Sequence, residues 1–150
     1  MVIRQMEAHD VECVATLITE LGYPATSADI ARRFERIDGH DNQLLLVADA
    51  GGEAIGWIHV AVHPYLENDA SAEILGLVVR DAQRGRGIGA ALVDAAESWA
   101  IRQGCGLLRV RSRIIRERAH AFYERHGFQR IKTQHCFQKT IAESGGPGTP

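Results

Sequence analysis

The segment Val78–Ala96 (VVRDAQRGRGIGAALVDAA) carries a pattern that could bind an anion. Glycine occupies every second position from Gly85 to Gly89, and Arg84 and Arg86 flank the first of these glycines. Glycine lets a ligand approach the backbone closely and permits dihedral angles that other residues avoid. An alanine-rich helical pattern follows, and the first N–H groups of a helix lack partners and attract negative charge. The segment therefore predicts a phosphate or pyrophosphate site.

Two other phosphate motifs compete for this interpretation. A Walker A loop requires Lys-Ser or Lys-Thr after its last glycine, and the two Lys-Thr pairs, Lys132-Thr133 and Lys139-Thr140, lie elsewhere in the chain. The pattern Gly85-x-Gly87-x-x-Ala90 does match the loose dinucleotide-binding fingerprint. That fingerprint also requires an acidic residue about 20 positions later, where the chain reads LLRVRSR. Dinucleotide binding is thus less favoured but stays open.

Two blocks together resemble the GNAT acyltransferase family. Arg84-x-x-Gly87-x-Gly89 is similar to the family signature Q/R-x-x-G-x-G/A, and Arg116–Phe128 (RERAHAFYERHGF) is similar to its later motif. The blocks stand in the family order. The resemblance implies an N-acetyltransferase that moves an acetyl group from acetyl-CoA to a primary amine by direct attack. It also implies an α/β fold with a mixed sheet whose central strands splay apart.

The resemblance assigns residues to the coenzyme. The backbone of Leu77, Val78 and Val79 would hold the pantetheine arm. The pyrophosphate would lie against the loop that follows, formed by Arg84, Gly85, Arg86, Gly87, Ile88, Gly89 and Ala90. Arg116 departs from the family pattern, because many members have asparagine there in contact with the coenzyme. An arginine at this position would meet a phosphate, or the contact would be absent.

Acetyl transfer to an amine requires proton transfer, because an alkyl amine is mostly protonated at neutral pH. Tyr123 aligns with the tyrosine that commonly protonates the departing sulfur in the family, and packing beside Phe122 is its structural alternative. Glu73 stands at the start of an apolar run, where many members place a catalytic base. Its alternative role is a solvated charge at the end of a strand.

The sequence says least about the acceptor amine. By analogy with the family, the acceptor would lie near Tyr23, Trp57, His63 and Tyr65. The polar loop 64–71 contains two carboxylates, which favours a cationic acceptor. A small amine, a polyamine and a protein amino group all remain open, as do a homodimer and a non-catalytic acyl-CoA sensor.

Hydrophobic periodicity predicts the elements that position these residues. The order of strands and helices indicates a mixed α/β domain. The expected strands are Val2–Met6, Leu44–Ala50, Ala54–His63, Glu73–Val79, Leu107–Arg111 and Thr133–Thr140. The expected helices run from Asp10 to Leu21, from a cap at Ser27 to Ile37, over Ile88–Arg102 and over Glu117–Arg125.

Composition limits which other classes of protein the chain could belong to. The 150 residues carry a net charge of −2, so a dedicated nucleic-acid binder is not expected. No stretch reaches the length of about 20 apolar residues that a membrane span needs, and we expect a cytoplasmic protein. No cysteine or histidine spacing indicates a metal site. We expect one domain over residues 1–143 and a disordered tail over 144–150.

Overall fold

The computed structural model describes residues 1–112 and 117–142. It divides the chain into two compact units, Met1–Arg111 and Ser112–Pro150. The predicted domain over 1–143 spans this division. The predicted tail over 144–150 lies outside the described residues, as does Arg116.

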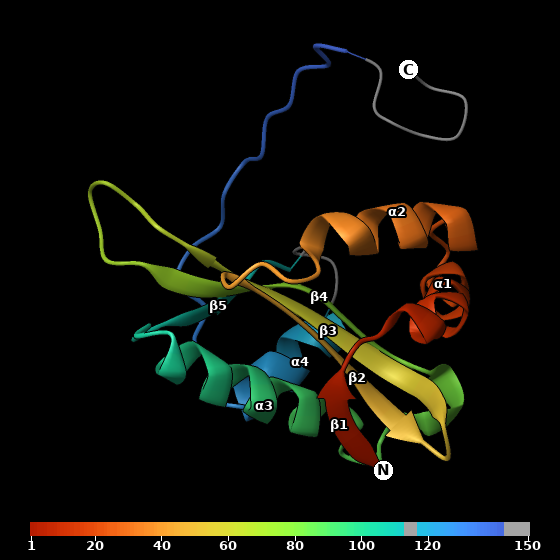
Figure 1. The fold of residues 1–150 in the computed structure, drawn as a ribbon. Coiled ribbons are helices and arrows are strands. Elements are labelled where there is room, and N and C mark those ends of the chain that lie inside the picture. The colour runs from red at the N-terminus through yellow and green to blue at the C-terminus, as the bar shows by residue number, and fades with distance from the viewer. Residues whose placement is uncertain (113–116, 143–150) are drawn as a thin grey trace. The chain divides into compact units, whose positions relative to one another are not determined.

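The first unit is built on one five-stranded mixed sheet (Figure 1). The strands stand in sequence order, and each neighbouring pair from β1 to β4 is antiparallel, whereas β4 and β5 are parallel. Gly51 and Gly52 join β2 to β3 with positive φ angles of 64° and 91°, which confirms the predicted hairpin. The strands are β1 (Val2–Gln5), β2 (Gln43–Ala50), β3 (Glu53–His63), β4 (Ser71–Val79) and β5 (Leu108–Val110).

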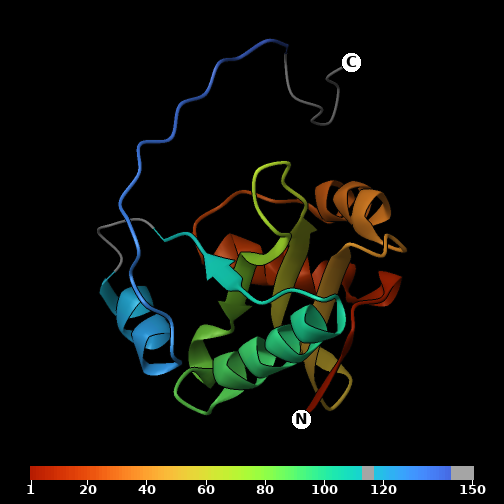
Figure 2. The same ribbon diagram turned by 90° about the vertical axis from the view of Figure 1, so that its left-hand side faces the viewer.

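Helices cover both faces of this sheet (Figures 1 and 2). Helices α1 (Val11–Glu20) and α2 (Ser27–Ile37) lie on one face, and α3 (Ile88–Arg102) lies on the other. Successive residues of β3 show the division, because side chains alternate between the faces of a strand. A Cβ at Gly56 would meet Ile88 and Leu92 of α3, whereas its neighbour Trp57 packs toward α1.

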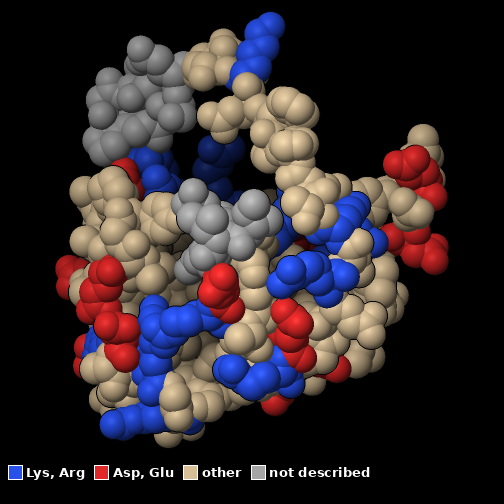
Figure 3. All heavy atoms as spheres, turned by 180° about the vertical axis from the view of Figure 1, so that it is seen from behind, with Lys and Arg blue, Asp and Glu red and all other residues tan. Residues whose placement is uncertain are grey.

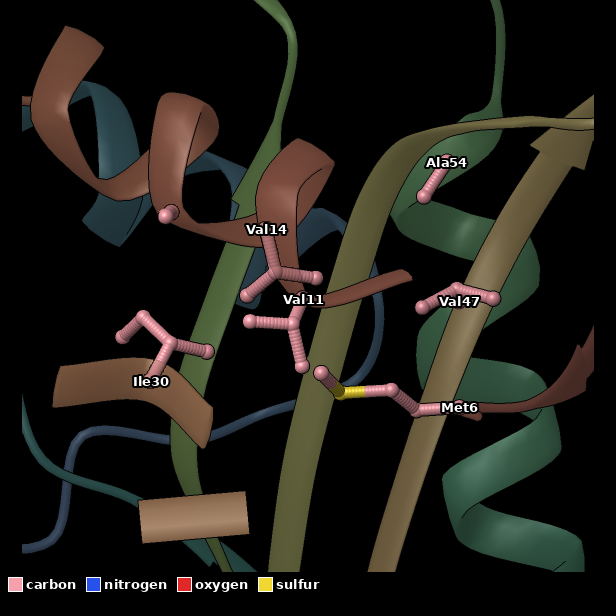
Figure 4. Close-up of a cluster of buried hydrophobic side chains, with 7 residues drawn as sticks. Met6, Val11, Val14, Ile30, Val47 and Ala54 are labelled. Atoms are coloured by element: carbon pink, nitrogen blue, oxygen red, sulfur yellow. The ribbon is translucent and has the colours of Figure 1, made fainter. Parts of the chain in front are cut away.

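A buried apolar cluster joins α1 and α2 to the sheet (Figure 4). Side chains from helices and strands point toward one another across this layer. The buried members are Met6, Val11, Val14, Ala15, Ile30, Val47 and Ala54. Burial of such side chains is the main stabilising contribution to the unit, and it holds α1 firmly over β3.

The start of α2 corrects one detail of the sequence analysis. The cap is Thr26 rather than Ser27: its Oγ1 accepts a hydrogen bond from the Asp29 N–H at 3.1 Å, and the Asp29 carboxylate accepts one from the Thr26 N–H at 3.2 Å. Reciprocal bonds of this kind form a capping box. Threonine and serine are both good caps, so the side-chain type alone did not decide between neighbours.

Strand β4 continues beyond its pairing with β5. The two strands pair only through Ala72, Glu73 and Ile74, with Leu108, Arg109 and Val110 opposite them. Directly after this point Leu75 forms a bulge against β3, because Ile74 pairs with Val60 and Gly76 with His59. Leu75 is 48% exposed, so the strand is not buried along its whole length as its apolar sequence indicated. The splayed central strands implied by the family resemblance are present.

The second unit contains α4 (Glu117–Arg125) among its described residues. His126 and Gly127 close the helix after Arg125, as predicted: Gly127 has φ of 88°, and the Phe128 N–H donates to the Tyr123 carbonyl at 3.0 Å. The predicted strand Thr133–Thr140 is wrong, because the described residues after Phe128 form no strand. A strand requires a partner for its backbone groups, and the described part of this unit supplies none.

Charged side chains of both signs are interspersed on the face shown in Figure 3, as the small net charge suggests. No helix in the described ranges has the length and apolar character that crossing a membrane requires.

Candidate active site

The glycine-arginine segment, residues 84–89, forms a tight turn that leads into α3. A short 3-10 helix, η2 (Asp81–Gln83), leads into it, and Gly85 and Gly87 adopt φ angles of 80° and 78°. A side chain at either glycine would meet no atom within 4 Å, so conformation rather than space requires glycine there. Gly87 is the N-cap of α3 and therefore provides no capping side chain.

The first turn of α3 presents backbone donors without acceptors. The first helical bond runs from the Ala91 N–H to the Gly87 carbonyl at 3.0 Å. The N–H groups of Ile88, Gly89 and Ala90 have no acceptor among the described residues, and the turn contains no acidic side chain. These donors and the positive end of the helix dipole are the features that attract an anion to a helix N-terminus.

The arginines near this loop differ in their surroundings. Arg84 pairs with Asp81 at 3.2 Å. The hydrogen bond from Arg80 to Glu53, at 2.6 Å, raises the pKa of the guanidinium. Arg86 is exposed beside the positive end of the helix. The loop thus presents positive charge around its backbone donors.

The unpaired edge of β4 lies between this loop and Glu73. Beyond Ile74, no described residue pairs with the side of β4 that faces away from β3. Leu77, Val78 and Val79 belong to this edge, and Val78 is buried whereas the other two are half-buried. An extended polar chain could add to such an edge by backbone hydrogen bonds.

Glu73 is buried and engaged through both carboxylate oxygens. Oε1 lies 2.8 Å from Nε2 of His63, and Oε2 lies 3.0 Å from Nε of Arg111. The carboxylate is therefore not the solvated charge at a strand end that the sequence left open. The imidazole of His63 also meets the ring of Tyr65 edge-on, with ring centroids 6.4 Å apart.

A family model described as "Acetyltransferase (GNAT) family" matches residues 10–128. The chain belongs to this family. The match crosses both compact units and includes both sequence blocks of the predicted signature.

Curated and solved relatives give the family likeness more detail. Aminoglycoside N(6′)-acetyltransferase type 1 of Klebsiella aerogenes is 29% identical over 101 residues, which cover 65% of this chain and 66% of the relative. A transcriptional regulator from Bacillus halodurans C-125 is 28% identical, with a TM-score of 0.84 over 92% of this chain and 99% of that one. The aminoglycoside acetyltransferase AAC(6′)-Iy, solved with a CoA bisubstrate analogue, shares the fold at 22% identity, with a TM-score of 0.83 over 93% and 98% of the two chains.

The GNAT fold brings together only some of the residues predicted for the acceptor. His63 and Tyr65 lie at the end of β3 next to Glu73. Trp57 packs against the apolar cluster, and its buried Nε1 has no hydrogen-bond partner among the described residues. Tyr23 follows α1 and is 56% exposed.

An open hollow elsewhere on the first unit contains none of these predicted residues. It lies along α1 and the start of α2, and two of its side chains are acidic. Its lining is Glu12, Ala15, Thr16, Thr19, Glu20, Ala25 and Ser27. The hollow shares no lining residue with the loop before α3 or with the cluster of Glu73, His63 and Arg111.

Tyr123 belongs to the second unit, on α4. Its ring contacts Phe122 and Phe128 at centroid distances of 5.4 and 5.5 Å. Tyr123 therefore has the aromatic packing contacts that the sequence analysis gave as its structural alternative. These contacts are compatible with a role for its hydroxyl group as an acid. Arg116 lies outside the described residues.

Sequence reasoning missed Arg111. The signal was available, because a strand was expected to end at this residue. A parallel pairing of that strand with Glu73–Val79 would have placed arginine beside the glutamate. In the observed register Glu73 stands opposite Arg109, and the arginine that contacts its carboxylate is Arg111, two residues further along the chain.

Proposed function

We propose that the protein is an acetyl-CoA-dependent N-acetyltransferase that transfers an acetyl group to a primary amine by direct attack within a ternary complex. One observation carries this proposal: the backbone donors at the start of α3 adjoin the unpaired edge of β4, which leads to the buried Glu73. These features match in order the pyrophosphate, the pantetheine arm and the reactive end of acetyl-CoA.

The residues of this chain fit the coenzyme in chemical type. Backbone N–H groups from Gly85 to Ala90 would bind the pyrophosphate, with Arg84 and Arg86 adding positive charge. The backbone of Leu77, Val78 and Val79 would pair with the pantetheine amides. Arg116 would contact a phosphate. Acetyl-CoA supplies the activated acetyl thioester.

Two proton-transfer functions complete the reaction. An acceptor amine must lose a proton, and the sulfur must gain one. We assign the first to the Glu73 cluster and the second to Tyr123, because a phenolic hydroxyl group can donate a proton. The support for Tyr123 is its position in the second family block.

The acceptor that we propose is a cationic small molecule of the aminoglycoside type. The relatives described as aminoglycoside acetyltransferases support this choice. Glu67 and Asp69 lie in the exposed loop beside Tyr65 and would attract such an amine. Tyr23, Trp57, His63 and Tyr65 remain the residues proposed for acceptor binding.

Thiol release measured over a panel of amines tests the proposal. The panel should contain neamine and other aminoglycosides, linear polyamines and peptides with a lysine or a free N-terminus. We expect acetyl-CoA turnover with an aminoglycoside and none with the peptides. Thermal unfolding with acetyl-CoA or NAD provides the control, because ligand at 100 times its Kd stabilises a protein by about 2.7 kcal/mol. Stabilisation by NAD alone would contradict the proposal.

A non-catalytic acyl-CoA sensor is the second candidate. The relative from Bacillus halodurans described as a transcriptional regulator favours it, because its fold covers nearly the whole of this chain. This candidate predicts stabilisation by acetyl-CoA without release of thiol from any amine of the panel.

A further inference from the structure

We propose that His63, oriented by Glu73, is the group that takes the proton from the acceptor amine. The inference rests on the proposed function and specifies one of its steps. Glu73 then acts as a positioning residue for the imidazole rather than as the base that meets the amine.

Hydrogen bonding determines which nitrogen of His63 is available. Oε1 of Glu73 lies 2.8 Å from Nε2 of the ring. A carboxylate is only an acceptor, so Nε2 must donate and carry the hydrogen. In the neutral ring the other nitrogen, Nδ1, then has a lone pair. No described residue forms a hydrogen bond with Nδ1.

Exposure separates the two candidate bases. The side chain of Glu73 is 10% exposed, and Arg111 holds its second oxygen at 3.0 Å. The side chain of His63 is 36% exposed. An amine arriving from solvent can therefore reach the imidazole, whereas both oxygens of the carboxylate are already engaged.

The groups that face His63 are consistent with this role. Ser71 stands opposite it on β4, and Tyr65 meets its ring from the following loop. On β3 itself, His59 lies on the same face but is bonded to Gln43 of β2 at 2.7 Å, and burial lowers the pKa of His59. Among the described residues, the charged groups at the site are thus Glu73 and Arg111, which is paired with the second carboxylate oxygen.

The step balances as follows. The amine nitrogen forms a bond with the acetyl carbon, and the bond between that carbon and the coenzyme sulfur breaks. Before attack, the ammonium form of the acceptor gives one proton to Nδ1 of His63, and the resulting imidazolium is paired with the Glu73 carboxylate. As the amide forms, its nitrogen releases a second proton to solvent, while Tyr123 in the proposed function gives its phenolic proton to the departing sulfur and regains one from solvent. Solvent later removes the proton from the exposed ring, so the net products are the amide, the free thiol and one proton.

NMR of the histidine ring nitrogens tests the geometry without any substrate. We expect His63 in the wild-type protein to show a protonated Nε2 and an unprotonated Nδ1 near pH 8. Glu73→Gln should change this tautomer distribution, because an amide can donate as well as accept. A wild-type ring with its hydrogen on Nδ1, or a ring that does not respond to Glu73→Gln, would overturn the proposal.

Kinetics with neamine and acetyl-CoA test the chemistry. His63→Gln should lower kcat about 100-fold or more while the KM for acetyl-CoA changes less than about threefold. The double variant with Glu73→Gln should be no slower than the slower single variant, because residues that act as a unit are not additive. Added imidazole should restore part of the activity of His63→Ala, which a merely structural histidine would not allow.

His59→Gln is the matched control, since it changes a histidine on the same strand and face. Its kcat/KM should keep the pH dependence of the wild type, whereas His63→Gln should lose the acidic limb. A His63→Gln variant with more than half the wild-type kcat and the same pH profile would overturn the role of His63 and leave the proposed function intact. Absence of wild-type turnover with every amine of the panel would contradict both.

Discussion

The indole of Trp57 lies directly against the Cα of Gly76. A Cβ at Gly76 would stand 2.5 Å from Cη2 and 2.7 Å from Cζ3 of the ring, closer than real Cβ contacts come. Gly76 follows the bulge at Leu75 and lies in the part of β4 whose outer side pairs with no described residue. The absent side chain therefore allows Trp57 to support this edge from the face that α1 covers.

Gly76→Ala should destabilise the protein by about 1–3 kcal/mol, because the added methyl group overpacks a large ring held by the core. Urea unfolding measures the loss. Gly106→Ala is the matched control, since a Cβ there meets no atom within 4 Å. It should change the free energy of unfolding by less than about 0.5 kcal/mol.

Trp57→Phe should partly rescue Gly76→Ala, because the smaller ring leaves room for the methyl group. The double variant should therefore lose less stability than the sum of the two single losses. Strict additivity would show that the contact between the two residues does not limit packing at this position.

Gly87→Glu should abolish the binding of acetyl-CoA, because it places a negative side chain at the N-cap of α3 beside the proposed pyrophosphate site. Calorimetric titration with acetyl-CoA measures the loss. Gly104→Glu is the control: Gly104 has a similar φ of 83° and equally open surroundings, at the other end of the same helix. It should cost comparable stability and keep the affinity. Equal loss of affinity in both variants would show that the loss results from impaired folding and not from the position of the negative charge.

Local patterns predicted most of the first unit correctly. The glycine pair at 51–52 indicated its hairpin, and Ile88–Arg102 has both the bounds and the glycine-rich start that were expected. Such features depend on backbone conformations that few residues other than glycine adopt, so a single sequence reveals them.

Features that depend on pairing between distant segments were harder to predict. The extended pattern of Thr133–Thr140 has no partner in the described part of its unit, and an apolar sequence did not reveal the bulge at Leu75. For the candidate site, the type and position of Glu73 were apparent from the sequence. Its burial and its bonds to His63 and Arg111 were not, because they follow from the register of three strands.

Asp10→Asn should destabilise the protein by about 2–3 kcal/mol at pH 7, because it weakens a buried ion pair. Burial alone would raise the pKa of Asp10. Hydrogen bonds from Arg4, at 2.8 Å to each oxygen, and from the Glu7 N–H more than offset this and hold the pKa of that carboxyl below its usual range. Chemical unfolding of both proteins at several pH values measures the difference.

The sign of the pH dependence follows from this lowered pKa. The contribution of Asp10 is fully present above the usual aspartate pKa of about 3.9, and it decreases as the pH falls through the folded value, where the unfolded chain binds more protons. The difference between wild type and Asp10→Asn should therefore shrink below about pH 4. Asp49→Asn, which removes a more exposed partner of Arg4, should cost less. A difference that stays constant down to pH 3 would argue against this assignment.

Tyr123→Phe should lower kcat while leaving folding and coenzyme affinity nearly unchanged. The substitution keeps the aromatic contacts with Phe122 and Phe128, and the backbone bond from the Phe128 N–H remains. The substitution removes the phenolic hydroxyl group and its proton, and general acid catalysis contributes typically 10²–10⁴-fold to a rate. Thiol release should show a decrease in kcat of at least about 10-fold, with the acetyl-CoA Kd from calorimetry within about twofold.

Phe122→Leu separates packing from chemistry on the same helix. It removes ring contacts with Tyr123 and His126 but keeps the hydroxyl group. If Tyr123 acts as the acid, Phe122→Leu should lower stability more than Tyr123→Phe does and lower kcat less. The reverse order would mean that the aromatic cluster on α4, rather than the phenolic proton, is what the reaction requires from this segment.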